Sequence, residues 1–183
     1  MSRYRDTPQD QMTAAQRRVQ DIIVAGKRGR LSGPFKVLIK APEICEHAAK
    51  LGEHLRWGSS LPARLSELAI CITARFWRAQ YEWFAHAPLA VRAGVSEAAI
   101  EAIRRGETPH FTQKDEALVH RVCTEIYKTQ RLTDASFNEA VSVLGEVGLI
   151  EVISVMGYYT LIGNTLNVFQ VALPEGETPP FPE

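Results

Sequence analysis

The sequence predicts an all-α fold, and three observations support this class. Alternating apolar and polar runs of the kind that form strands are nearly absent, glycine, proline and capping residues punctuate the chain often, and apolar residues recur at helical spacing. The 183 residues, 45% hydrophobic and 23% charged, are enough for one domain with a sizeable core. We therefore expect a helical bundle of seven or eight helices with short connections.

The first predicted helix begins at Thr13. With Gln16 three residues later, Thr13 forms a capping-box pattern, and the helix ends near Gly26 and Gly29. A loop precedes the short apolar piece at residues 35–40.

Prolines mark the starts of the next two helices, because proline fits the first turn of a helix. Pro42 predicts a helix that continues to Trp57, and Pro62 opens the following one. Gly94 closes this part of the chain. Further capping and stop residues predict helices over 96–106, 112–128 and 133–144.

Gly145 and Gly148 precede a long apolar helix that ends near Leu173. Residues 152–173 carry no charge and resemble a membrane span, but they include Asn164, Asn167 and Gln170, which would be costly in a bilayer. We interpret this helix as the centre of the core, with a membrane span as the alternative.

Domain boundaries and location follow from composition. We expect a single helical domain over 1–173, with an N-terminal helical extension at 1–30, and a Pro-rich tail at 174–183 that is extended or mobile. The polar N-terminus has no apolar stretch of the kind that secretory signals need, so we expect a cytoplasmic protein with no membrane partner.

Charge and cysteine content narrow the function classes. The 21 basic and 21 acidic residues cancel, which gives no support for a nucleic-acid partner. Cys45, Cys71 and Cys123 form no CxxC and no zinc-type spacing, so we expect buried free thiols and no metal centre.

The candidate site lies in the stretch 65–94, where Glu67, Glu82 and His86 stand among apolar and aromatic residues. Glu82 and His86 are four residues apart, on one helix face. Glu67 precedes His86 by nineteen residues, roughly 28 Å along one continuous helix. The two can meet only if the chain turns back. No glycine or proline marks such a turn, and we place it near Trp77 and Arg78.

Three interpretations of these ionisable residues stay open. A carboxylate beside a histidine forms an acid–base unit, whereas Glu82 and His86 could equally be an ordinary surface pair. A metal held by His86 and two glutamates lacks a recognisable motif.

Asn164, below Tyr158, either satisfies neighbouring backbone or lines a pocket. The aromatic residues nearby form core or pocket wall: they include Tyr81 and Trp83.

Residues 64–106 resemble the carboxymuconolactone decarboxylase family, which includes alkylhydroperoxidase D-like disulfide reductases. The block Tyr81-Glu82-Trp83 with His86 carries the resemblance, together with Arg64 and Glu67, which resemble the family's RxxE. The resemblance extends over 31–173. It implies an alkylhydroperoxidase D-like helical fold, neighbouring Glu67 and His86 helices, and assembly into a homo-oligomer, a trimer or hexamer.

Within this family, the resemblance implies the decarboxylase chemistry and not the thiol chemistry. Ala79 and Glu82 fall where the peroxidase branch has its two cysteines, and thiol chemistry needs that thiolate. The decarboxylase branch removes CO₂ from a small unsaturated lactone formed in aromatic-compound breakdown, without a cofactor.

Carried over to this chain, that resemblance makes His86 the proton donor, oriented by Glu67 and tuned by Glu82. Arg75 or Arg78 would hold the substrate carboxylate. The chain is longer than the dedicated decarboxylases, so a non-catalytic oligomer that binds a small molecule is the alternative.

Overall fold

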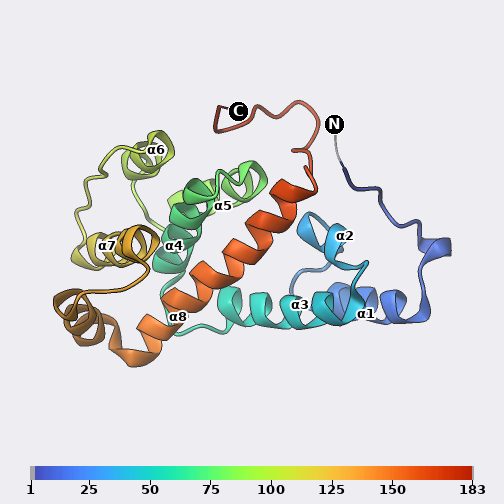
Figure 1. Ribbon diagram of the computed structural model, residues 1–183, viewed down its shortest axis with the longest axis horizontal. Helices are drawn as coiled ribbons and strands as arrows, with labels where there is room; N and C mark the ends of the chain where they lie inside the picture. The colour runs from blue at the N-terminus through green and yellow to red at the C-terminus, as the bar shows by residue number, and fades with distance from the viewer. Residues whose placement is uncertain (1–2, 183) are drawn as a thin grey trace.

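The computed structural model describes residues 3–182, and these form eight α-helices and a 3₁₀ turn, with no strand in that range (Figure 1). The all-α prediction is confirmed. The helices are α1 (Ala14–Ala25), α2 (Pro34–Leu38), α3 (Pro42–Trp57), α4 (Ala63–Phe76), α5 (Gln80–Arg92), α6 (Glu97–Arg105), α7 (Lys114–Thr129) and α8 (Asp134–Val168), and the 3₁₀ turn is Gln9–Gln11.

Local capping sets several helix boundaries where the sequence predicts them. Thr13 and Gln16 form the reciprocal capping box at the start of α1. Ser96 accepts a hydrogen bond from the Ala99 amide at the start of α6, and Gly106, at a φ of 76°, ends that helix. These boundaries depend on neighbouring residues only, which is why the sequence reveals them.

Helix α8 is the centre of the molecule. It crosses the structure from the α7 side to the α2 side (Figure 1) and contacts α2, α3, α4, α5 and α7. Its inner face is fully buried at Val152, Val155 and Ile162. By length and composition alone α8 could cross a membrane, and 39% of its most apolar window is buried. Its contacts with five helices support the interpretation as a core helix.

The sequence predicts one helix over 133–144 and a second, long helix after Gly145 and Gly148, whereas the structure has a single kinked helix, α8. Gly145, at a φ of 72°, is the non-helical residue inside α8, so the predicted break lies there. Gly148 does not break the helix: it is buried within the second part of α8. A side chain at Gly148 would crowd Leu144, which explains the small residue at this position.

Helices α4 and α5 form the antiparallel pair that carries the predicted site. Helix α4 ends at Phe76 and α5 begins at Gln80, so the chain reverses over 77–79. This confirms the predicted turn. Arg78 has a φ of 49°, a left-handed conformation unusual for a residue other than glycine, asparagine or aspartate. A single left-handed residue thus replaces the glycine that the sequence lacks here.

The C-terminal tail is extended and is docked on α5. Phe181 is only 3% exposed, and its ring lies 5.2 Å from that of Trp83. The side-chain amide of Gln80 accepts a hydrogen bond from the Phe181 amide and donates one to the Phe181 carbonyl. The described part of the tail is therefore attached to the start of the helix that carries Glu82 and His86.

Candidate active site

His86 lies between two glutamates inside the α4–α5–α8 core. Its Nδ1 is 2.7 Å from Oε2 of Glu67, and its Nε2 is 3.4 Å from Oε2 of Glu82. His86 is 6% exposed and Glu82 is 4% exposed. The ring of Tyr159, from α8, meets the imidazole edge-on at a centroid distance of 4.9 Å. Burial and these contacts exclude the interpretation as an ordinary surface pair.

The surroundings of His86 favour proton transfer. Burial raises the pKa of the Glu82 carboxyl above its ordinary value, and the nearby charge of Glu67 adds to this, while His86, Arg56 and Arg28 oppose it. A raised pKa favours the protonated form of this carboxyl. With its proton on Nδ1, His86 donates to the Glu67 carboxylate, and Nε2 is then free to exchange a proton beside Glu82.

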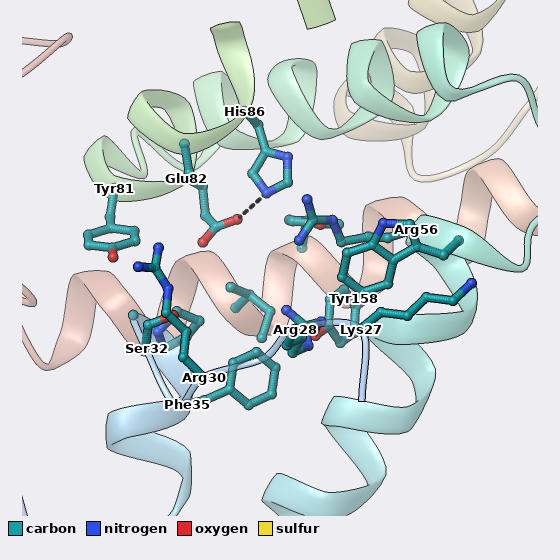
Figure 2. A pocket seen from close by; sticks show the side chains of 16 residues that line it. Lys27, Arg28, Arg30, Ser32, Phe35, Arg56, Tyr81, Glu82, His86 and Tyr158 are labelled. Atoms are coloured by element: carbon teal, nitrogen blue, oxygen red, sulfur yellow. Dashed lines mark hydrogen bonds and ion pairs between the residues drawn. The ribbon is translucent and has the colours of Figure 1, made fainter. Parts of the chain in front are cut away.

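A cavity of about 240 Å³ opens onto His86 and Glu82 (Figure 2). Its walls come from five parts of the chain: the segment between α1 and α2, the start of α2, the end of α3, the first half of α5 and the C-terminal half of α8. The lining residues are Lys27, Arg28, Arg30, Ser32, Gly33, Pro34, Phe35, Arg56, Trp57, Tyr81, Glu82, Ala85, His86, Tyr158, Tyr159 and Ile162. Such a concave, partly buried site suits a small molecule.

The cavity wall is strongly basic. Lys27, Arg28, Arg30 and Arg56 line it, against the single carboxylate of Glu82. Among residues 3–182, none of these four cations forms an ion pair with a carboxylate, whereas Arg18 pairs with Glu46 at 2.7 Å. An unneutralised basic wall attracts anions.

The structure brings together five of the residues that the sequence predicts for the site. Glu82, His86, Tyr81 and Tyr158 line the cavity, and Glu67 contacts His86 from behind. Burial raises the pKa of Tyr158 to about 12, so its hydroxyl keeps its proton near neutral pH.

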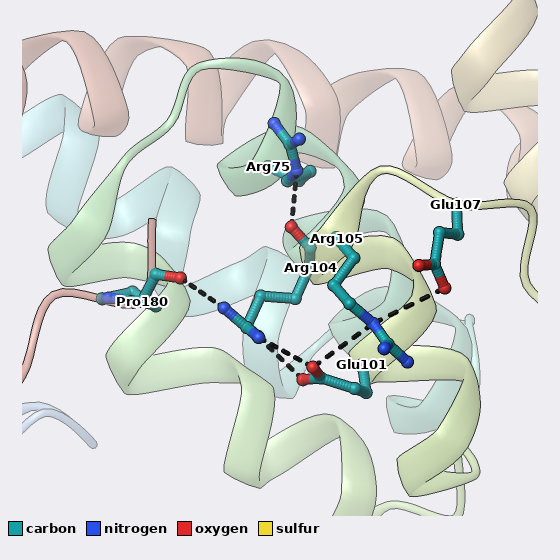
Figure 3. Close-up of polar contacts among 6 residues, drawn as sticks. All are labelled: Arg75, Glu101, Arg104, Arg105, Glu107 and Pro180. Carbon is teal, nitrogen blue, oxygen red and sulfur yellow. Dashed lines mark hydrogen bonds and ion pairs between the residues drawn. The ribbon is translucent and has the colours of Figure 1, made fainter. Parts of the chain in front are cut away.

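The two arginines predicted to hold the substrate do not line the cavity. The Nε of Arg75 donates to the carbonyl of Arg104, 2.8 Å away at the end of α6 (Figure 3). Arg78 donates to the carbonyl of Pro182 in the tail. Both guanidinium groups, those of Arg75 and Arg78, thus lie on the side of the α4–α5 pair that faces α6 and the tail. The arginines that the cavity offers instead are Arg28, Arg30 and Arg56.

Trp83 and Asn164 also lie away from the cavity. Trp83 is 4% exposed and packs against Phe181, on the side of α5 toward the tail. Asn164 is half-buried on α8 and does not line the cavity, although Ile162, two residues earlier, does. Asn167 donates to the carbonyl of Trp77 at 2.7 Å, so this amide satisfies backbone in the α4–α5 turn.

Sequence reasoning missed the basic residues of the cavity. A usable signal exists: residues 22–42 contain Lys27, Arg28, Arg30 and two further lysines, with no acidic residue. A basic stretch of this kind is normally interpreted as a solvent-exposed loop. Only the packing of α1 on α3, and of α3 on α8, turns it toward His86.

Thiol and metal chemistry find no support in the described residues. Burial raises the pKa of Cys45 and of Cys123 to about 12, and it raises the pKa of Cys71 well above its ordinary value. Protonated, buried thiols are poor nucleophiles. Within residues 3–182, no group of three or more His, Cys, Asp or Glu side chains is arranged to hold a metal ion.

The acid–base residues of this site fall within a stretch that is similar to a known protein family. Residues 42–120 match the profile of the carboxymuconolactone decarboxylase family, and no curated protein matches the chain significantly. The matched part runs from α3 into α7 and includes Glu67, Glu82 and His86. Arg28 and Tyr158 lie outside it. Residues 42–120, somewhat less than half of the chain, are therefore similar to the carboxymuconolactone decarboxylase family.

Proposed function

We propose that the protein is a cofactor-free carboxy-lyase that resembles 4-carboxymuconolactone decarboxylase. It would act on a small lactone or a related carboxylic acid from aromatic-compound breakdown. The observation that carries the proposal is the position of His86, buried between Glu67 and Glu82 and open to a basic cavity.

In the proposed reaction, the bond between the substrate carbon and its carboxylate breaks and CO₂ leaves. The electron pair delocalises into the unsaturated lactone as a dienolate. His86 then donates a proton to carbon, with Glu67 holding the imidazole through Nδ1. His86 regains its proton from water, so the net change consumes one proton and releases CO₂. A positioned proton donor of this kind contributes roughly 10²–10⁴ in rate.

The test is CO₂ release from γ-carboxymuconolactone by the wild-type protein, by His86→Gln and by His110→Gln. His110 is exposed in the loop after α6, so it controls for the loss of any histidine. We expect release by wild type and by His110→Gln, and loss in His86→Gln. Equal release by all three proteins would remove His86 from the mechanism. No release by the wild type would reject this substrate.

A non-catalytic binding protein is the second candidate. Three of the four cavity cations, Lys27, Arg28 and Arg30, lie outside the matched residues 42–120, so binding could persist without the reaction. A protein that retains an anion in the cavity and releases no CO₂ from any lactone or carboxylic acid offered would favour this candidate.

We also propose that the protein self-associates into a homo-oligomer through α8. Val147, Ile150, Leu161 and Val168 recur at helical spacing on the outer side of α8 and are 44–62% exposed. We call these four residues the α8 outer stripe. Apolar stripes of this length on a core helix are commonly covered by another subunit.

A further inference from the structure

We propose that Arg28 and Arg56 together form a subsite for a carboxylate group of the ligand, built jointly by the segment before α2 and the end of α3. The proposal rests on the proposed function only in that both place the ligand in the same cavity. The ligand would be a small organic anion with a carboxylate. Neither arginine belongs to the acid–base residues Glu67, Glu82 and His86.

The first evidence is that neither guanidinium group forms an ion pair with a carboxylate of residues 3–182, although both lie near enough to Glu82 to interact with its charge. Among the same residues, the only hydrogen bond of Arg28 runs from Nη2 to the Tyr158 hydroxyl, at 3.3 Å. The Nε atoms of both Arg28 and Arg56 are buried without a hydrogen-bond partner among the described residues. A buried donor without a partner destabilises the protein. The planar fork of a guanidinium matches the two oxygens of a carboxylate, which makes a carboxylate the natural partner of these two groups.

Aromatic rings hold the two guanidinium groups in place. Arg56 lies over the ring of Trp57 at 4.5 Å, and Arg28 lies 5.8 Å from the same ring and 4.3 Å from that of Phe35. Stacking on a ring fixes the plane of a guanidinium and leaves its N–H edges free for an anion. The arginines are thus oriented before a ligand arrives.

The space for this arrangement is provided by Gly52, inside α3. A Cβ at this position would overlap the Tyr158 hydroxyl and would lie 2.5 Å from Nη2 of Arg28. Glycine inside a helix is less favourable than alanine. At Gly52 the missing side chain leaves the space in which Tyr158 and Arg28 pack against α3, so the position of Arg28 depends on this glycine.

The subsite lies beside the acid–base residues. Arg28 and Arg56 both line the cavity with His86 and Glu82 (Figure 2). Both arginines are close enough to Glu82 to stabilise its ionised form. A ligand whose carboxylate sits between the guanidinium groups therefore has its remaining atoms within the same 240 Å³ cavity as His86.

Gly33 secures the segment that carries Arg28. It has a φ of 55°, and a Cβ there would lie 3.0 Å from the ring of Tyr81. This contact packs the segment against the start of α5, so residues 26–35 act as a fixed wall of the cavity. Since this wall precedes residues 42–120, ligand choice depends on a part of the chain outside the family match.

The experiment is calorimetric titration with benzoate, its neutral analogue benzamide and inorganic phosphate, at low ionic strength. The variants are Arg28→Met and Arg56→Met, with Arg121→Met as the matched control, because Arg121 pairs with Glu139 on the surface. Charged hydrogen bonds are worth about 1.5–3 kcal/mol, so each cavity variant should weaken benzoate binding roughly 10- to 100-fold. Benzamide binding and the control variant should be unaffected.

Three results would overturn the proposal: no benzoate binding by the wild type, benzoate binding by both cavity variants that is as tight as that of the wild type, or tighter binding of phosphate than of benzoate. Thermal melts check folding. If a methionine variant does not fold, Arg28→Lys and Arg56→Lys decide instead. Lysine keeps the charge but lacks the planar fork, so weaker binding is expected and unchanged binding would count against the subsite. Benzoate binding is measured without turnover, so the subsite can hold even where CO₂ release fails.

Discussion

The hydroxyl of Tyr158, on α8, occupies the place that a side chain at Gly52, on α3, would need. Gly52→Ala should therefore force these helices apart. Overpacking of this kind costs about 1–3 kcal/mol of unfolding free energy, which outweighs the helix preference for alanine. Denaturant unfolding measures it. Lys50→Ala, two residues earlier on the exposed face, should lose only its surface pair with Glu46, and a Gly52→Ala protein as stable as this control would contradict the packing.

Glu67→Gln should reduce turnover while leaving the fold intact. Glutamine keeps the shape of the side chain but carries no charge, so it neither fixes the tautomer of His86 nor stabilises the imidazolium. We expect kcat for CO₂ release to fall roughly 100-fold or more, within the range for acid–base residues. Glu43→Gln, at an exposed position on α3, is the control. An unchanged kcat in Glu67→Gln would mean that this contact is only structural.

Glu82 should make the protein less stable as the pH rises. Its folded pKa is raised above the ordinary value of 4.5 by burial. Below pH 4.5 the carboxyl is protonated in both states. Above that pH the unfolded chain releases the proton first, which favours unfolding until the folded pKa is passed. Glu82→Gln, always neutral, should become increasingly more stable than the wild type from pH 4.5 upward. Parallel melting curves for the two proteins across pH 4–9 would refute this expectation.

The cysteines should resist alkylation in the folded protein. All three are buried, and Cys45 and Cys123 have a pKa raised to about 12, so they stay protonated at pH 8. We expect negligible reaction with iodoacetamide at pH 8 and three adducts after unfolding in guanidinium, both read by mass spectrometry. Rapid labelling of the native protein would reopen thiol chemistry.

The α8 outer stripe should control self-association. Ile150→Glu places a charge on the stripe, where Ile150 is 61% exposed, so it should disfavour contact between subunits. We expect a shift toward monomer in sedimentation velocity. Ile44→Glu, at an isoleucine on α3 that is 56% exposed, should leave the assembly unchanged. A wild-type protein that is monomeric at micromolar concentration would reject the homo-oligomer proposal.

The sequence predicts the local features of this fold well. The helix starts at Thr13 and Ser96 depend on side-chain caps, and the start at Pro42 depends on a proline in the first turn, so all three can be predicted from neighbouring residues. The reversal near Arg78 can also be predicted, because Glu67 and His86 would otherwise lie about 28 Å apart on one helix. What makes the reversal possible, a left-handed arginine, carries no sequence signal.

The cavity wall could not be predicted from spacing. Arg75 and Arg78 lie near Glu82 in sequence, but hydrogen bonds to the Arg104 and Pro182 carbonyls hold them on the side of α6 and the tail. Arg28 is 58 residues before His86, and it reaches the cavity only because α1 and α3 pack together and α3 meets α8. Contacts between distant segments depend on the packing of whole helices, which a single sequence does not encode in any short pattern.

The placement of Arg28 in the segment before α2 separates two roles that many enzymes combine in one loop. The proton-transfer residues belong to the α4–α5 pair, whereas three of the four cations that line the cavity lie in residues 26–35. Exchanging this short segment as a cassette would offer a direct route to altered ligand range, with the chemistry of His86 retained on an undisturbed scaffold.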